Sequence, residues 1–302
     1  MKQPISVQSW SATPTPLTPT LEVDVPSVGR MIEAAVADGL HGLFMAGTCG
    51  EGPWLANRER IRLIEAASKA ARGRIKIAAQ VSDNSVPRIR DNMNDMAAAG
   101  ADYVVIAHPP TLLNATPERV AGLFLEASTI SPLPVGIYDL GSRRPLAIAE
   151  DRLESVYLHP KVEFVKDSSA APSRRAIALS ARAKRPGLKL FNGDEFCAIE
   201  YLEAGYDGFM FGGAVVAAPH LRRIGEHFAA GRLAEAKAED EAMKAMLYGI
   251  YGGESIACWL TGLKYCLQCM GMFSTSTSFL GYPLTAECKA YIEAYVARRQ
   301  RG

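Results

Sequence analysis

Short apolar segments rich in β-branched residues alternate with longer amphipathic segments along most of the chain. This alternation is typical of β-strands that are each followed by a covering helix. Eight strands are predicted, at residues 7–12, 42–46, 75–81, 103–107, 135–138, 162–166, 188–191 and 208–211. Several are apolar on both faces, as expected of parallel strands buried beneath helices. Eight such units close naturally into a (β/α)8 TIM barrel, and an open doubly wound sheet is the alternative.

The segments between and after the strands carry helix signals. In residues 58–71 apolar residues recur at helical spacing, and Asn57 is the expected N-cap. After Gly231 the strand signal stops, and three helices are predicted, at residues 233–249, 255–270 and 285–299. We therefore divide the chain into a barrel catalytic domain, residues 1–230, and a C-terminal helical extension, residues 231–302.

Composition excludes several classes of protein. Of the 302 residues 48% are hydrophobic and 22% charged, and the net charge of +1 leaves no basic stripe for nucleic acid. No segment approaches the roughly 18 apolar residues of a membrane span, and residues 1–20 lack the apolar run of a signal peptide. The cysteines are scattered without a disulfide-like framework, as expected of reduced thiols in the cytosol. Together these features predict a cytoplasmic protein without a membrane partner. Cys266 and Cys269 form a C-x-x-C pair, but no second Cys or His pair lies nearby, so we expect core packing and no metal.

A lysine ends the predicted strand at residues 162–166. Active sites of barrels lie at the carboxyl ends of the strands, so Lys166 is expected to point into the site. An ammonium ion is penalised in a low-dielectric site, which favours the neutral amine that attacks a carbonyl. Lys166 is therefore a candidate Schiff-base lysine; the alternative is a lysine that reaches solvent or pairs with Asp167.

The preceding strand ends in Tyr138, whose hydroxyl can shuttle protons near the lysine nitrogen. A core aromatic is the alternative role for this residue. Ser142 and Arg143 follow shortly after it. An arginine binds carboxylates in bidentate fashion, so this pair can hold a distal carboxylate or hydroxyl of the substrate, unless Arg143 is only solvated.

The second strand opens into a loop of small residues, Gly47–Gly52. Such residues let backbone amides converge on an anion, such as the carboxylate of a 2-keto acid. A nucleotide phosphate loop requires a lysine after the last glycine, and Pro53 stands there instead. A βα turn without a ligand is the remaining alternative.

Together these motifs resemble the dihydrodipicolinate synthase and N-acetylneuraminate lyase family. Gly47-Thr48-Cys49-Gly50-Glu51 is similar to that family's G-T-T-G-E, and Tyr138 with Ser142-Arg143 to its Y-N-x-P-S-R. The remaining matches are Val165-Lys166-Asp167-Ser168-Ser169, Asn192-Gly193-Asp194 and Gly208-Phe209-Met210. The matches occur in the family's order over nearly the whole chain.

The resemblance implies a homotetrameric barrel that binds pyruvate, or a pyruvyl-containing substrate, on Lys166, without a separate cofactor. It implies Tyr138 as the acid and base. The substrate-binding residues that it implies are Thr48, Cys49, Gly50, Ser142, Arg143, Asn192 and Met210, the last through its main chain.

Three departures bear on the substrate. Cys49 stands where the family's synthases have a second Thr that belongs to a proton relay. Their P-P-Y-Y segment, which supplies a tyrosine to the neighbouring subunit, is replaced by Pro109-Pro110-Thr111-Leu112. Gly141 replaces a Pro. These departures favour a lyase that performs aldol cleavage, condensation or dehydration on a sugar-derived or aromatic 2-keto acid. One alternative is 4-hydroxy-tetrahydrodipicolinate synthase of lysine biosynthesis. Others are a degenerate barrel that binds a keto acid or protein without turnover, and a phosphate-binding barrel using residues 211–214.

Overall fold

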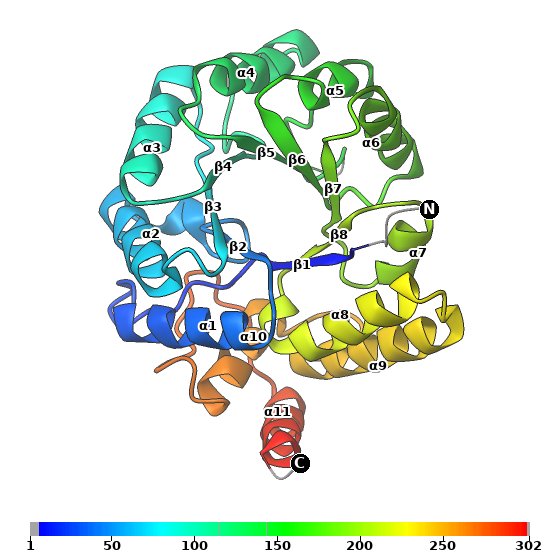
Figure 1. The fold of residues 1–302 in the computed structure, drawn as a ribbon. Helices are drawn as coiled ribbons and strands as arrows, with labels where there is room; N and C mark the ends of the chain where they lie inside the picture. Colours follow the sequence, from blue (N-terminus) through cyan, green and yellow to red (C-terminus); the bar gives the residue numbers. More distant parts are fainter. Residues whose placement is uncertain (1–5, 114, 143, 301–302) are drawn as a thin grey trace.

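Eight parallel strands close into a barrel in the computed structural model of the chain, in the order β1 to β8 (Figure 1). The structure describes residues 6–113, 115–142 and 144–300. The strands are β1 (Gln8–Ser11), β2 (Gly42–Met45), β3 (Lys76–Gln80), β4 (Tyr103–Ile106), β5 (Val135–Asp139), β6 (Val162–Asp167), β7 (Lys189–Asn192) and β8 (Gly208–Phe211). Each lies within one residue of its predicted ends. The predicted (β/α)8 TIM barrel is therefore confirmed, and the open sheet is excluded.

Helices cover the outside of the barrel between successive strands (Figure 1). They are α1 (Val25–Ala37), α2 (Asn57–Ala71), α3 (Val86–Ala98), α4 (Pro117–Ile130), α5 (Glu150–Tyr157), α6 (Pro172–Lys184), α7 (Ala198–Glu203) and α8 (Ala214–Ala229), with a 3-10 turn, η1, at Gly52–Trp54. The predicted cap of α2 is wrong. Ala56 is the N-cap and makes no side-chain hydrogen bond, because extended backbone at Leu55 and Ala56 places Asn57 already in the first turn.

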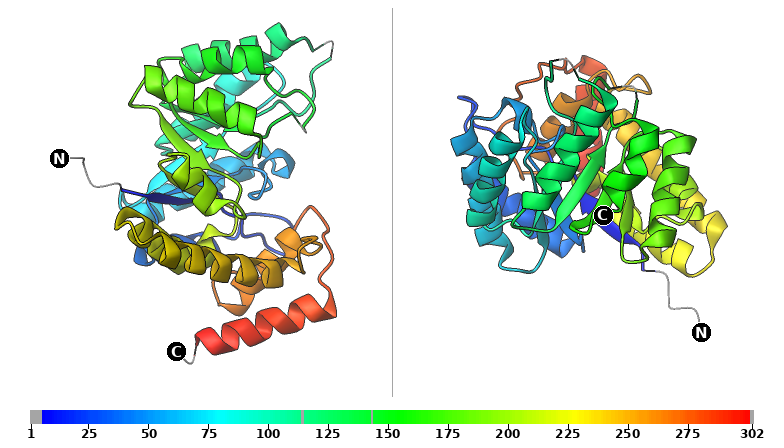
Figure 2. Two further views of the ribbon diagram at one scale, coloured as in Figure 1. Left: turned by 90° about the vertical axis from the view of Figure 1, so that its right-hand side faces the viewer. Right: turned by 90° about the horizontal axis from the view of Figure 1, so that it is seen from above.

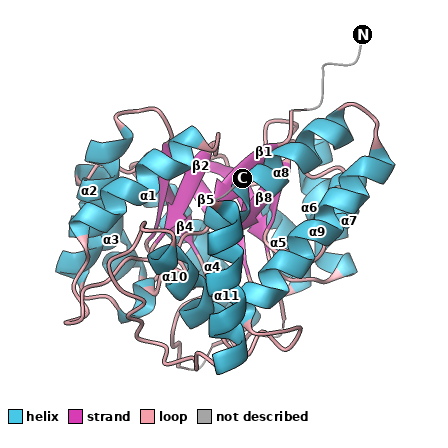
Figure 3. Cartoon of the chain, turned by 90° about the horizontal axis from the view of Figure 1, so that it is seen from below, coloured by secondary structure: helices cyan, strands magenta, loops and turns pink. Residues whose placement is uncertain are grey.

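Three further helices follow, as predicted: α9 (Leu233–Tyr251), α10 (Trp259–Cys269) and α11 (Ala286–Arg299). Helix α9 packs along α8, and α10 and α11 pack against each other and against α9. Figures 2 and 3 show α11 as the outermost of these helices. Helix α10 begins four residues later than predicted, because Gly252 and Gly253 have positive φ angles and residues 252–258 form turns.

Aromatic side chains fill the interior of the barrel. Trp10, Phe164 and Phe191 contact one another there, with ring centroids 5.8 to 6.0 Å apart. Glycines on neighbouring strands make room for these rings. A Cβ atom at Gly42 or at Gly136 would lie 2.2 Å from ring atoms of Trp10 or Phe164 respectively. The packed interior confines polar chemistry to the carboxyl ends of the strands.

A buried ion pair fixes the end of β5 from outside the barrel. The carboxylate of Asp139 accepts hydrogen bonds from Arg174 Nε and Nη2 at 2.8 Å, from Tyr157 at 2.9 Å and from the Gly141 amide at 3.0 Å. Burial opposes ionisation of this carboxyl, but His108 and Arg174 favour the charged form and hold the pKa of Asp139 below its usual range. Since Tyr138 precedes Asp139, this network also fixes the backbone of the candidate acid and base.

Replacing Arg174 tests how much stability this network supplies. Arg174→Leu leaves the Asp139 carboxylate buried without its charged partner, which costs about 3–5 kcal/mol in unfolding free energy. The adjacent Arg175 pairs with Glu200, whose side chain is 59% exposed, so Arg175→Leu should cost at most about 1 kcal/mol. Urea unfolding measures both values. Equal losses for the two variants would contradict the assigned role.

Candidate active site

Lys166 lies inside the barrel mouth, one residue before the end of β6. Its side chain is 3% exposed, and its Nζ atom donates to Ser168 Oγ at 2.9 Å. A Cβ atom at Gly193 would lie 2.9 Å from this nitrogen, so only glycine leaves the amine its space on that side. No ion pair to Lys166 occurs among the residues that the structure describes. The amine is thus buried and positioned, and none of the described carboxylates forms an ion pair with it.

Asp167 is not the partner of Lys166. Successive residues of a strand point to opposite faces. Asp167 points outward, where its carboxylate accepts hydrogen bonds from Ser169 N at 2.9 Å, Ser169 Oγ at 2.6 Å and Tyr206 at 2.7 Å. Burial raises the pKa of Asp167, although these hydrogen bonds oppose the rise. The alternative in which Asp167 neutralises Lys166 is therefore excluded.

Tyr138 lies beside Lys166 on the neighbouring strand. The two residues are paired in the register of β5 and β6, and Lys166 Nζ is 3.8 Å from the centre of the Tyr138 ring. Phe44 of β2 packs edge-on against the same ring, with centroids 5.6 Å apart. The structure thus brings both predicted catalytic side chains together at the barrel mouth.

The loop after β2 is held rigidly by its own glycines. The Gly52 amide donates to Gly47 O at 3.1 Å, and Thr15 Oγ1 donates to Gly50 O at 2.6 Å. A Cβ atom at Gly52 would lie 1.8 Å from Ala46 O, so any other residue here would displace the loop. Thr48 of this loop lines a cavity of about 580 Å³ that extends to Trp54 and Leu140. The predicted carboxylate-binding loop therefore stands at the edge of a space large enough for a substrate.

The C-terminal extension clamps this loop through a buried ion pair that sequence reasoning missed. Glu51 and Lys264 of α10 are both fully buried and paired with each other. The same carboxylate accepts from Ser278 Oγ at 2.9 Å and from the Phe279 amide, while Lys264 also donates to Thr277 O at 2.7 Å. The sequence did contain a signal for this ion pair: Lys264 is a single lysine on the otherwise apolar face of a predicted helix.

Cys49 is a buried thiol in the same loop. Burial raises its pKa, and the nearby carboxyl of Glu195 raises it further, so the thiol stays neutral. Because a neutral thiol is a weak hydrogen-bond donor, it is a poor substitute for the hydroxyl of a proton relay.

The other predicted substrate-binding residues differ in their placement. Met210 lies in the barrel interior, and Ser142 is exposed. Arg143 lies outside the described residues. Asn192 points away from the interior. Its Nδ2 atom donates hydrogen bonds to Asp194 O at 2.9 Å and to Cys197 O at 3.1 Å, and these bonds stabilise the loop after β7. That contradicts the expected direct contact with substrate, because the strand alternation turns Asn192 outward.

Glu195 and Tyr251 are the second pair that sequence reasoning missed. Glu195 belongs to the loop after β7, and its carboxylate accepts from the hydroxyl of Tyr251 on α9 at 2.8 Å and from the Gly213 amide at 2.9 Å. The glycines after β8, considered above as a phosphate loop, thus serve a carboxylate of the protein itself.

Neither a metal cluster nor a membrane helix was found in the part of the chain that the structure describes. No group of three or more His, Cys, Asp or Glu residues there is arranged to hold a metal ion. None of the helices there is long and apolar enough to cross a membrane. Cys266 and Cys269 are free thiols, and Cys266 is buried in the core.

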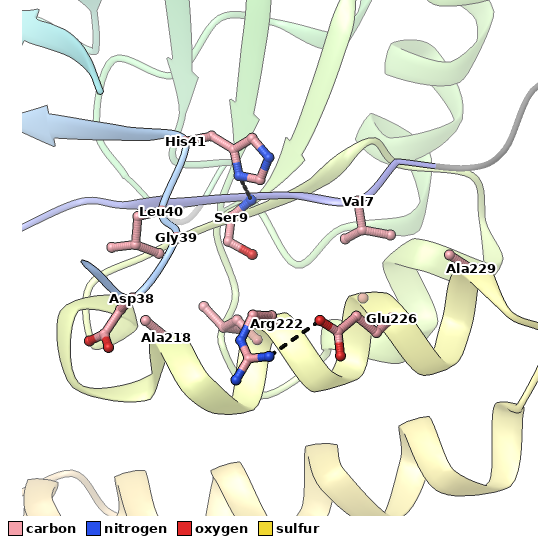
Figure 4. A pocket seen from close by; sticks show the side chains of 12 residues that line it. Val7, Ser9, Asp38, Gly39, Leu40, His41, Ala218, Arg222, Glu226 and Ala229 are labelled. Carbon is pink, nitrogen blue, oxygen red and sulfur yellow. Dashed lines mark hydrogen bonds and ion pairs between the residues drawn. The ribbon is translucent and has the colours of Figure 1, made fainter. Parts of the chain in front are cut away.

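A smaller cavity, of about 190 Å³, lies at the opposite end of the barrel, where β1 and β2 begin (Figure 4). His41 accepts a hydrogen bond from the Ser9 amide there at 3.2 Å, and Arg222 pairs with Glu226 on α8. These polar groups bind each other, and they lie at the barrel end that usually serves stability.

Comparison with known proteins agrees with this geometry. A model of the Dihydrodipicolinate synthetase family matches residues 6–296. The chain belongs to this family. The resemblance inferred from the motifs is therefore confirmed, and the chain is a lyase of the family's pyruvate-dependent, Schiff-base type.

Relatives of the dihydrodipicolinate synthetase family cover most of the chain. The 4-hydroxy-tetrahydrodipicolinate synthase of Gluconacetobacter diazotrophicus is 25% identical over 238 residues, which cover 79% of this chain and 80% of the relative. The dihydrodipicolinate synthase of Bacteroides thetaiotaomicron superposes with a TM-score of 0.83 at 24% identity, covering 99% and 100% of the two chains. A prophage protein of Escherichia coli K12 from the same family, solved with pyruvate, gives 0.83 at 16% identity and covers 97% and 98%. These two solved structures share the fold.

Replacing Lys264 tests the clamp on the loop. Lys264→Met leaves Glu51 buried without its cation and should lower the unfolding free energy by about 3–5 kcal/mol. Adding Glu51→Gln should recover part of that loss, because the two residues form one unit. The control is Lys184→Met, since Lys184 pairs with Glu154 at the surface, where the two side chains are 55% and 33% exposed, and its loss should cost about 1 kcal/mol or less. Strictly additive losses in the double variant would contradict the clamp.

Proposed function

We propose that Lys166 forms a Schiff base with the keto carbon of pyruvate, or of a longer 2-keto acid with a pyruvyl end. The observation that carries the proposal is the buried Lys166 amine, unpaired with any carboxylate of the described residues and held against the Tyr138 ring. A lysine amine held in the barrel mouth without a carboxylate to bind it is placed to act as the nucleophile that attacks a carbonyl carbon. In this proposal residues 1–230 form the catalytic barrel and residues 231–302 the helical extension.

The roles of the surrounding groups follow from their positions. Lys166 attacks the keto carbon, and Tyr138 transfers the protons that convert the carbinolamine into the imine and water. Thr48 and the amides of Cys49 and Gly50 bind the carboxylate of the keto acid. The imine withdraws electrons from the adjacent bond, so the reaction needs neither a separate cofactor nor a metal.

Farther from the imine, Met210 offers a main-chain contact from the barrel wall, and Ser142 with Arg143 holds the distal part of the substrate. For Arg143 this role rests on the sequence motif alone.

The reaction proposed is aldol cleavage, condensation or dehydration of a sugar-derived or aromatic 2-keto acid. The neutral Cys49 thiol is a weak replacement for a relay hydroxyl, and no tyrosine occupies residues 109–112. The cavity beside Thr48 has an aromatic wall at Trp54, which is 48% exposed, and therefore suits a distal group larger than a methyl.

A second candidate is 4-hydroxy-tetrahydrodipicolinate synthase itself, since several relatives carry that name. A degenerate barrel without turnover is the candidate from another class, and it requires that no imine forms.

We also propose a cytoplasmic homotetramer. Leu113 lies in the loop after β4, where the family's synthases send a tyrosine into the neighbouring subunit, and it is 79% exposed. A large apolar side chain exposed at this position supports a subunit contact there.

Reduction with borohydride in the presence of pyruvate tests the imine. The peptide containing Lys166 should gain the mass of a reduced pyruvyl adduct, because borohydride makes the imine bond permanent. Lys166→Ala should abolish the adduct, whereas Lys189→Ala, at the exposed start of the next strand, should leave it unchanged. An adduct on other lysines only, or none at all, would overturn the proposal.

Tyr138→Phe tests the proton transfer. Without the hydroxyl, the rate of imine formation from pyruvate should fall about 10²- to 10⁴-fold, while the Lys166 amine keeps its contact with the ring. Quenching with borohydride at successive times measures this rate. Tyr103→Phe, which alters a ring on β4 packed against Trp10, is the matched control and should change the rate less than threefold or so. A Tyr138→Phe variant as fast as the unaltered enzyme would show that another group carries the protons.

A further inference from the structure

A buried arginine lines the cavity beside Thr48 and has no part in the reaction described so far. Arg60 lies near the start of α2 and is 7% exposed, and its Nη2 atom donates to the backbone oxygen of Gln80 at 2.5 Å. Neither its Nε nor its Nη1 atom donates a hydrogen bond to any residue that the structure describes. The guanidinium therefore keeps donors that the described part of the protein does not use.

No carboxylate of the described residues neutralises this guanidinium. Asp83 and Asp95 are the acidic groups near enough to act on Arg60, and neither forms an ion pair with it. The Asp83 carboxylate is bound instead by Arg88 Nε at 2.6 Å and by the Asn84 amide at 2.7 Å. A guanidinium stays protonated when it is buried, so its burial without an anion is costly. An anionic ligand in the cavity would offset that cost.

The cavity continues from the mouth of the barrel. Ala107, at the end of β4, lines the cavity and belongs to the same interior cluster as Tyr138. Leu140, two residues beyond Tyr138, also lines the cavity and packs against that cluster. Thr48 and Arg60 line the same space of about 580 Å³. A substrate whose keto-acid end lies at the loop after β2 can therefore extend through the cavity to Arg60.

The charged side chains that line the cavity are mostly positive. They belong to Arg60, Arg88, Arg144 and Asp83. Because Asp83 pairs with Arg88, Arg60 and Arg144 remain without a carboxylate partner among the described residues. Trp54, which is 48% exposed, adds an apolar wall. This lining favours a ligand that has a carbon chain and an anionic end.

We propose that Arg60 binds a second carboxylate of the substrate, so that Lys166 acts on a dicarboxylic 2-keto acid. The proposal rests on the proposed function, because the keto-acid end of the substrate must form the imine. It names the distal group of the substrate, which the proposed function leaves open. Arg60 is then a residue that determines specificity and takes no part in the covalent steps.

Borohydride trapping measures this specificity directly. The concentration that gives half of the maximal adduct on Lys166 is measured for 2-oxoglutarate, 2-oxoadipate and 2-oxopimelate, and for monocarboxylic 2-keto acids of equal chain length. In the unaltered enzyme at least one dicarboxylic acid should need a concentration about 10- to 100-fold lower than its monocarboxylic match, because it gains a charge-assisted hydrogen bond.

Arg60→Gln should remove this preference. The adduct with pyruvate should stay within about twofold of its normal yield, because pyruvate has no second carboxylate. Arg62→Gln is the matched control on the same helix, since the Arg62 side chain is 49% exposed, and it should keep both the preference and the pyruvate adduct.

Each outcome has one meaning. A preference lost in Arg60→Gln, with the pyruvate adduct retained, supports the assignment. An unaltered enzyme that traps both classes of acid equally well overturns it, whether or not the variant folds. A preference that survives in Arg60→Gln also overturns it, because another cation would then bind the second carboxylate, and so does loss of the pyruvate adduct in that variant, because Arg60 would then serve the fold. Failure of the proposed function itself would appear as absence of a pyruvate adduct in the unaltered enzyme.

Discussion

Closure of the parallel sheet is the constraint on which the rest of the molecule depends. In a closed parallel barrel every strand ends at the same rim, and successive residues point alternately into the barrel and toward the helices. Lys166 and Asp167 show the consequence: one enters the mouth beside Tyr138, and the other points outward to Ser169 and Tyr206. The same alternation separates Tyr138 from Asp139. Two adjacent polar residues can thus serve chemistry and structure independently.

The C-terminal extension belongs to the active site as much as the barrel does. It supplies Lys264, which pairs with Glu51 in the loop after β2, and Tyr251, which donates a hydrogen bond to Glu195 in the loop after β7. Breaking a buried pair costs several kcal/mol, a large part of the 5–15 kcal/mol by which a typical domain is stable. The loops after β2 and β7 therefore owe their shape to helices outside the barrel, and the division of the chain near residue 230 does not divide the site.

The sequence predicted the barrel well because short apolar runs rich in β-branched residues, alternating with amphipathic segments, are typical of buried parallel strands and their covering helices. Lys166 and Tyr138 were found for the same reason, since position at a strand end implies position at the mouth. Glu195 and Lys264 could not be found in this way. Their partners are 56 and 213 residues distant, and only the packing of the extension brings them together. Asn192 was misplaced because its motif did not show which face of β7 it occupies.

A crystal structure of the enzyme soaked with pyruvate tests the central claim most directly. The account predicts continuous electron density from Lys166 Nζ to C2 of the pyruvyl group, with the carboxylate on the loop of Thr48, Cys49 and Gly50. Pyruvate bound away from an unmodified Lys166, with the loop after β2 empty, would contradict it.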